Sequence, residues 1–120
     1  MNATVSWKGI SISCRVMDSF FSHVKGLMFS RRLRKDKGVL FVFPDDQQRD
    51  IHMLFVFFAL DVVWLDHNGK VLKIAREVKP FTPFVQGTVA RYWLEVDAGV
   101  AEKLHVGDRL TINLKRSDIS

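Results

Sequence analysis

The chain has 120 residues, of which 48% are hydrophobic and 26% are charged, and its formal net charge is +5. A chain of this size and composition forms one globular domain that can bury its own core without disulfides or metal. Cys14 is the single cysteine, so an intramolecular disulfide is excluded. The basic balance favours acidic partners.

The longest apolar stretch, Ile51 to Leu65, is interrupted by His52 and Asp61. It is shorter than the roughly 20 residues that a membrane-spanning helix needs. The N-terminal sequence MNATVSWKGI lacks the charged region and apolar run of a signal peptide. We therefore expect a cytoplasmic protein without a membrane partner, which agrees with the low cysteine content.

The N-terminal residues alternate in polarity as half-buried strands do. Val5 and Trp7 lie on one face of the first predicted strand. After Gly9 the alternation resumes in a second strand, with Ile10, Ile12, Cys14 and Val16 facing inward.

The period then changes to that of a helix. Apolar residues within 20–28 recur at the spacing of one helix face, and Asp18 or Ser19 can cap its start. A run of cations follows this predicted helix and ends before Gly38: Arg31, Arg32, Arg34, Lys35 and Lys37.

Three apolar stretches in the middle of the chain predict strands that are covered on both faces. They are Val39–Phe43, Ile51–Phe58 and Leu60–Leu65, with a polar turn predicted at Asp45–Asp50. The Asn-Gly dipeptide at 68–69 then predicts a tight hairpin.

The rest of the chain is predicted to form further strands and one short helix. Lys70–Val78 is the return strand of the hairpin, Lys79–Thr88 is a loop that contains prolines, and Val89–Val96 alternates as a strand. Asp97 can cap a short helix, after which the last strand carries three inward residues: Leu110, Ile112 and Leu114.

These elements predict a mostly β protein, a β-rich α+β fold. We expect a small, partly open β-barrel of about seven or eight strands with one or two short helices packed on it. No linker or repeat divides the sequence, so residues 1–120 form a single domain. A two-layer α+β sandwich is the alternative.

Five phrases occur in an order and spacing that resemble one family. They are GLMFSRRL at 26–33, GVLFVFP at 38–44, ALDVVWLD at 59–66, RYWLEVDAG at 91–99 and VGDRL at 106–110. Over residues 16–114 the chain is similar to the uncharacterised conserved ACR family of bacteria and archaea, domain of unknown function number 192. The resemblance implies a single β-rich domain without a cofactor motif and with no assigned activity.

The chain departs from the family pattern at 52–61. Many family members carry Trp-Met-Lys-Asn-Thr, then an apolar pair and Pro-Leu-Asp, whereas this chain reads HMLFVFFALD. Met53, Leu60 and Asp61 match the pattern, and the Lys, Asn, Thr and Pro do not. If those polar residues form a ligand site in the family, this chain lacks the site or has an apolar version of it.

Asp61 is the most prominent polar candidate, because it stands between apolar neighbours and an unpaired buried carboxylate is costly. We favour a structural carboxylate bound to backbone N–H groups or to an arginine over a functional one. His52 could join it as the acid and base of a hydrolase or transferase. A satisfied histidine is favoured, since no ligand-spaced partner is present. No catalytic residue, metal site or cofactor is therefore assigned.

Phe81 and Phe84 lie in the predicted proline-bearing loop, where they plug the open end of the barrel or line a groove. Together with Asp61 and with Met28, near the end of the predicted helix, they outline a candidate binding pocket. The favoured function is a non-enzymatic module that binds a small molecule or a protein. The alternative is RNA or DNA binding through the cations of 31–37, although that run lacks interleaved aromatic residues.

Overall fold

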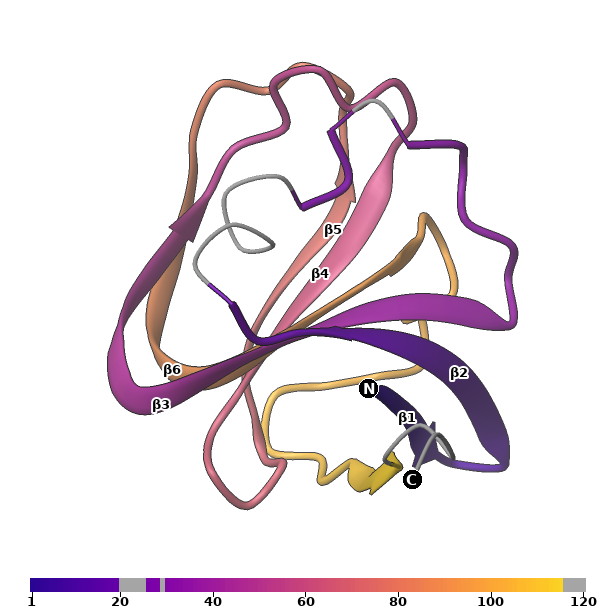
Figure 1. Cartoon of the computed structure of the whole chain (residues 1–120), viewed down its shortest axis with the longest axis vertical. Helices are drawn as coiled ribbons and strands as arrows, with labels where there is room; N and C mark the ends of the chain where they lie inside the picture. The colour runs from indigo at the N-terminus through magenta and orange to yellow at the C-terminus, as the bar shows by residue number, and fades with distance from the viewer. Residues whose placement is uncertain (20–25, 29, 116–120) are drawn as a thin grey trace.

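The computed structural model describes residues 1–19, 26–28 and 30–115 (Figure 1). These residues form one curled seven-stranded sheet with the strand order β5-β4-β6-β3-β2-β1-β7. β2 and β3 pair in parallel, and the other neighbours in the sheet pair antiparallel. The strands are β1 (Asn2–Trp7), β2 (Ile10–Met17), β3 (Lys37–Ile51), β4 (Leu60–Leu65), β5 (Val71–Val78), β6 (Val85–Asp97) and β7 (Thr111–Lys115).

The sheet curls without closing, because β5 and β7 remain its two edges. The segment that precedes β7 reaches the start of β5, where Lys70 and Arg109 form an isolated antiparallel bridge. The N–H of Val71 also donates to the carbonyl oxygen of Asp108 at 2.7 Å. The prediction of a small, partly open, mostly β barrel is confirmed.

Apolar side chains are buried on both faces of the central strands. Leu40 belongs to one buried cluster, which also contains Val5, Ile12, Val63, Leu94 and Val96. Val39 and Phe41 belong to a second cluster, with Val62 and Trp64, and alternate residues of a strand face opposite sides. The prediction that Val39–Phe43 and Leu60–Leu65 are covered on both faces is confirmed.

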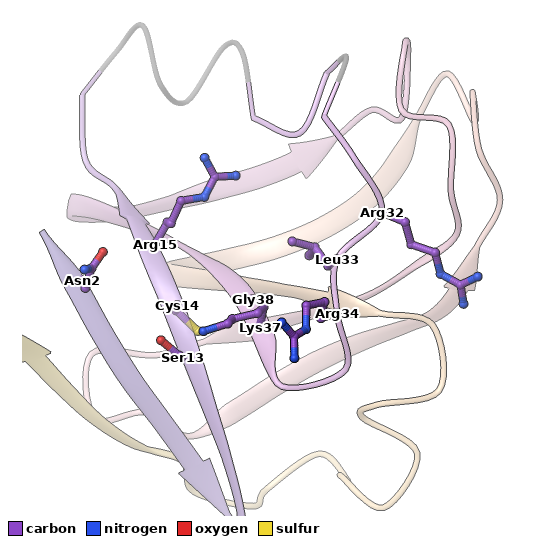
Figure 2. A pocket seen from close by; sticks show the side chains of 9 residues that line it. All are labelled: Asn2, Ser13, Cys14, Arg15, Arg32, Leu33, Arg34, Lys37 and Gly38. Atoms are coloured by element: carbon purple, nitrogen blue, oxygen red, sulfur yellow. The ribbon is translucent and has the colours of Figure 1, made fainter.

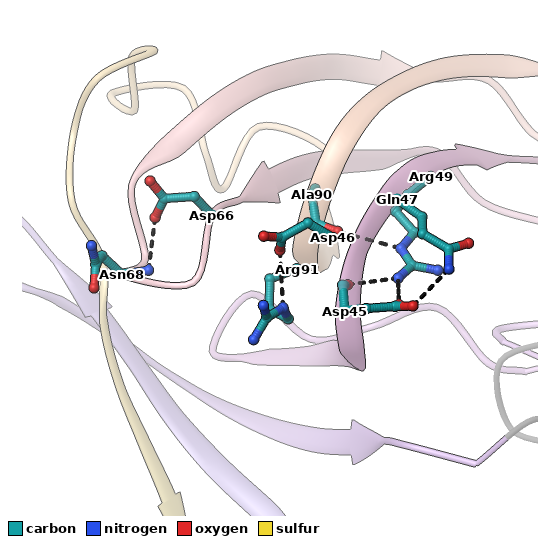
Figure 3. A network of polar contacts seen from close by, with 8 residues as sticks. All are labelled: Asp45, Asp46, Gln47, Arg49, Asp66, Asn68, Ala90 and Arg91. Atoms are coloured by element: carbon teal, nitrogen blue, oxygen red, sulfur yellow. Dashed lines mark hydrogen bonds and ion pairs between the residues drawn. The ribbon is translucent and has the colours of Figure 1, made fainter.

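The polar segment Asp45–Asp50 corrects a prediction, since it continues β3 and does not form a turn. After a register shift it pairs with β6, opposite Thr88 and its neighbours. Arg49 donates to the Asp45 carboxylate at 2.8 Å, and Arg91 of β6 donates to Asp46 at 2.9 Å (Figure 3). Hydrogen bonds to a strand that is distant in sequence thus outweigh the local preference for a turn.

The segment that follows corrects a second prediction. The apolar pattern predicts a strand over Ile51–Phe58, but β3 ends at Ile51 and residues 52–59 form a loop. Met53 is buried in this loop and pairs with the 79–84 loop. Its N–H donates to Thr82 at 2.7 Å, and its carbonyl accepts the N–H of Phe81 at 2.9 Å. Met53, Val56 and Phe58 are therefore buried in the second cluster from a loop and not from a strand.

The predicted helices are not seen in the described part of the chain. The helix expected over 20–28 lies mostly outside the described residues, and 26–28 form a turn. The helix expected after Asp97 is replaced by turns over 98–103, because Gly99 has a φ of +93° that a helix does not allow. No helix among the described residues is long and apolar enough to cross a bilayer.

Candidate functional site

Asp61 on β4 is 1% exposed and its carboxylate accepts three backbone hydrogen bonds. Oδ1 accepts the N–H of Glu77 at 2.8 Å. Oδ2 accepts the N–H groups of Gly99 at 2.9 Å and Ala101 at 3.0 Å. These donors satisfy a buried carboxylate, and they join β4 to the end of β5 and to the turns after β6. We therefore assign Asp61 a structural role.

His52 lies exposed in the 52–59 loop, where its Nδ1 accepts the N–H of Leu54 at 3.2 Å. Asp61 is bound to other backbone segments, and no hydrogen bond links the two side chains within the described residues. The arrangement does not favour an acid–base pair. Within the same residues, no group of three or more His, Cys, Asp or Glu side chains could hold a metal ion.

Cys14 is buried on the inward face of β2, as the alternation predicts. Burial raises the pKa of its thiol to about 12, because the thiolate would lose its hydration. A thiol with such a pKa is a poor nucleophile at neutral pH. Cys14 therefore acts as a small apolar residue.

A pocket of about 420 Å³ lies beside β2 and the start of β3, and part of the basic run, the cations of 31–37, lines it (Figure 2). We call this cavity the cationic pocket. In the view of Figure 2, Lys37 and Arg34 lie in the middle of the lining residues, Arg15 lies above them, and Arg32 lies at one side with its guanidinium pointing away from the others. Its lining residues are Asn2, Ser13, Cys14, Arg15, Arg32, Leu33, Arg34, Lys37 and Gly38.

The parallel pairing of β2 with β3 builds this pocket. Ser13 and Lys37 are register partners, and the N–H of Ser13 donates to the carbonyl of Asp36 at 3.0 Å. This bond holds residues 30–36, the connection that precedes β3, against β2. Ser13 and Arg15 are both exposed, as expected for alternate residues on the face opposite Cys14. Residues of the connection therefore stand next to polar side chains from a part of the chain that is distant in sequence.

Two of the four cations in the pocket have carboxylate partners. Arg32 donates to both oxygens of Asp97, at 2.9 Å and 3.1 Å, and so fastens the connection to the end of β6. Arg34 lies 3.6 Å from the carboxylate of Asp36. Arg15 and Lys37 form no ion pair among the described residues. The pocket thus retains positive charge that an anion could neutralise.

The remaining predicted basic residues, Arg31 and Lys35, are exposed beside the pocket and do not line it. Met28 is half-buried in the 26–28 turn and is not a lining residue either. The basic residues predicted from the sequence are therefore divided. Arg32, Arg34 and Lys37 line one pocket, and the other two flank it.

Phe81 and Phe84 are exposed and belong to a second surface, formed by the 52–59 and 79–84 loops. We call it the aromatic loop surface, and its side chains are between 41% and 60% exposed: Leu54, Phe55, Phe57, Phe81 and Phe84. The Phe81 ring lies edge-on to the rings of Phe57, with centroids 5.0 Å apart, and Phe55, at 6.2 Å. Phe55 and Phe81 have φ angles of +58° and +61°.

Sequence reasoning missed residues of both surfaces. Arg15 and Ser13 could be placed on an outward face by alternation, but only the β2–β3 pairing brings them to the basic run. The apolar pattern places Phe55 and Phe57 in a buried strand, whereas they are exposed in a loop. Leu54 and Phe55 stand where the family pattern has Lys and Asn, so the departure from that pattern lies in the aromatic loop surface.

Comparisons with known proteins agree with the fold. The UPF0127 protein of Pyrococcus furiosus is 37% identical over 111 residues, which cover 88% of this chain and 91% of the relative. A crystal structure of a proposed transcription regulator from Sinorhizobium meliloti has a TM-score of 0.83 at 21% identity, covering 92% of this chain and 91% of that one. A protein of unknown function from Novosphingobium aromaticivorans has a TM-score of 0.79 at 20% identity, covering 92% and 83%.

At such identities the two crystal structures are evidence for the shared fold alone. The family model for domain of unknown function 192, described as an uncharacterised ACR, matches residues 2–112. This match spans almost the whole sheet, from β1 into β7. The chain belongs to this uncharacterised ACR family.

Proposed function

We propose that this chain is a non-enzymatic binding protein whose cationic pocket takes a small anion that bears phosphate or carboxylate groups. The observation that carries the proposal is a cavity of about 420 Å³ with four cationic side chains in its wall. A cavity of this size suits a small-molecule ligand. Arginine and lysine bind phosphate and carboxylate oxygens through charge-assisted hydrogen bonds, which are stronger than neutral ones.

The lining residues have different roles in the proposed binding. Lys37 and Arg15 offer charges without a carboxylate partner among the described residues, and the Ser13 hydroxyl offers a neutral donor beside them. Arg34 can exchange its weak, solvent-exposed pairing with Asp36 for the ligand. Arg32 is held by Asp97 and acts as a positioning residue that keeps the connection in place.

Isothermal titration calorimetry with pyrophosphate and with citrate tests this proposal. We expect Lys37→Gln and Arg15→Gln each to weaken binding by about tenfold, the effect of losing one charge-assisted hydrogen bond. Lys35→Gln is the matched control, because Lys35 is an exposed cation of the same connection that does not line the pocket. We expect it to change the affinity less than about twofold, since Lys35 does not line the pocket and salt screens the influence of a charge at a distance.

Two outcomes would contradict a pocket for small anions. One is the absence of binding heat with either probe in a folded wild-type protein. The other is an equal loss of affinity in Lys35→Gln and Lys37→Gln, which would indicate a general response to net charge.

The exposed positions of Arg31 and Lys35 favour nucleic acid as a second candidate, because they extend the positive surface beyond the pocket. A complex of this kind depends on phosphate contacts, so its affinity for a single-stranded oligonucleotide should fall steeply with rising salt. Lys35→Gln should then weaken oligonucleotide binding as much as Lys37→Gln does. Affinity that is independent of salt would rule this candidate out.

A further inference from the structure

The aromatic loop surface is separate from the cationic pocket, since none of its five side chains lines that pocket. Figure 1 shows the 52–59 loop between β3 and β4 and the 79–84 loop between β5 and β6 at the same end of the sheet. The backbone hydrogen bonds of Met53 with Thr82 and Phe81 hold the two loops together. The exposed rings are therefore displayed on a preassembled pair of loops.

A group of exposed rings is uncommon on a soluble protein and usually marks an interaction surface. Phe84 is 60% exposed, and Phe81 is 44% exposed while it also holds a left-handed backbone conformation. Bulky side chains rarely adopt that conformation, and such strain concentrates at functional sites. Burial in the protein core explains neither ring.

Several backbone N–H groups of these loops are satisfied within the pair of loops. The N–H groups of Met53 and Phe81 donate to the opposite loop, and the N–H of Val56 donates to Met53 at 3.1 Å. The 79–84 loop also contains Pro80 and Pro83, which have no N–H to satisfy. These bonds and the two prolines lower the cost of bringing the loops to the edge of a bilayer, because the apolar region offers a backbone no hydrogen-bonding partner.

The charges of the loops favour an anionic surface. Residues 51–60 and 78–88 contain no acidic side chain, and Lys79 is their one lysine or arginine. Asp50 lies at the base of the loops, where it accepts hydrogen bonds from the N–H of Gly87 and from the Gln48 side chain. Glu77 lies near the end of β5, before the 79–84 loop, and follows Arg76 in the sequence. The chain as a whole carries a net charge of +5, which adds long-range attraction to anionic lipids.

We propose that the aromatic loop surface is a peripheral anchor that inserts its phenylalanine rings into the headgroup boundary of an anionic lipid bilayer, with Lys79 against the lipid phosphates. A bilayer accepts protruding rings without a complementary shape, whereas a protein interface usually supplies hydrogen-bonding side chains at its rim. This anchor needs no spanning segment. It therefore departs from the expectation of no membrane partner, which rested on the absence of such a segment.

Sedimentation with vesicles tests the anchor, using phosphatidylcholine alone and phosphatidylcholine mixed with phosphatidylglycerol. We expect the wild-type chain to bind the mixed vesicles more tightly. Phe84→Ser should weaken that binding by about tenfold, since it removes one large apolar side chain from the boundary. Lys79→Glu should lower the affinity for the mixed vesicles and leave the affinity for phosphatidylcholine alone nearly unchanged.

Val106→Ser is the matched control, because Val106 is 65% exposed in a turn outside the two loops. We expect it to bind the mixed vesicles like the wild type. Circular dichroism establishes that each variant is folded. Pyrophosphate titration of the same variants should be unchanged, which separates failure of the anchor from failure of the proposed anion pocket.

Three results would overturn the anchor. The first is a folded wild-type chain that does not sediment with the mixed vesicles. The second is an equal loss of binding in Val106→Ser and Phe84→Ser. The third is a wild-type dimer in light scattering that Phe84→Ser converts to a monomer, because the rings would then be covered by a second copy of the chain.

Discussion

The indole N–H of Trp64 on β4 donates a 2.6 Å hydrogen bond to the carbonyl oxygen of Arg49 on β3, although β6 lies between these strands in the sheet. The indole can reach across β6 because Gly87 has no side chain at the crossing point. A Cβ at Gly87 would lie 1.8 Å from the Arg49 oxygen and 2.4 Å from the Trp64 nitrogen. The hydrogen bond between Trp64 and Arg49 thus holds the polar segment of β3, residues 45–50, next to the second core cluster.

Gly87→Ala should therefore be strongly destabilising. We expect the free energy of unfolding to fall by about 3 kcal/mol or more, because the new methyl group displaces the indole or the carbonyl from a packed region. Urea denaturation followed by circular dichroism measures the loss. Gly9→Ala is the control, since its added Cβ meets nothing within 4 Å and only its φ of +80° is strained. Equal losses in the two variants would show that the crossing is not tightly packed.

Asp61→Ala should also destabilise the fold, because it leaves three backbone N–H groups without their acceptor. We expect a loss of about 3 kcal/mol or more in urea denaturation. Asp66→Ala is a comparison in a half-exposed turn, where the carboxylate accepts two backbone N–H groups and water can replace it. An Asp61→Ala variant of wild-type stability would refute the structural assignment.

Glu95 should make stability depend on pH. Burial raises the pKa of this carboxyl from 4.5 to about 7, and the nearby Trp93 indole opposes the shift. Between these values the folded chain retains a proton that the unfolded chain has released. The free energy of unfolding therefore falls as pH rises through this window, by about 3 kcal/mol in total.

Glu95→Gln tests this dependence, because the amide does not titrate. We expect the difference in unfolding free energy between about pH 5 and about pH 8 to be smaller in the variant by nearly the whole of that amount. Urea denaturation at the two pH values measures it. Parallel pH profiles for the two proteins would show that Glu95 does not titrate in this range.

Phe81→Gly tests whether the Phe81 ring contributes to folding stability or only to membrane binding. Glycine adopts a φ of +61° without strain, so the relief should offset the lost ring contacts and leave stability within about 1 kcal/mol of the wild type. Vesicle binding should fall, as we also expect for Phe84→Ser. Phe84→Gly is the control, since Phe84 has no positive φ and its replacement relieves no strain. A larger loss of stability in Phe81→Gly than in Phe84→Gly would show that the Phe81 ring serves the fold.

The local features of the fold could be predicted from the sequence. Alternation placed Ile12, Cys14 and Leu94 inward, and all three are buried. The hairpin at 66–69 forms as predicted, with Gly69 at a φ of +81°. These features depend on side-chain period and on backbone conformations that single residues favour, so a short window of sequence contains the information.

Tertiary structure decided the features that depend on distant partners. Asp45–Asp50 is polar, yet it forms a strand because β6 offers hydrogen bonds to it, and 52–58 is apolar, yet it belongs to a loop over the second core cluster. The candidate site follows the same rule. The basic run was visible in the sequence, but Arg15 joins Lys37 only because β2 pairs in parallel with β3. Period indicates which residues share a face, whereas the strand pairing between distant segments determines what each face meets.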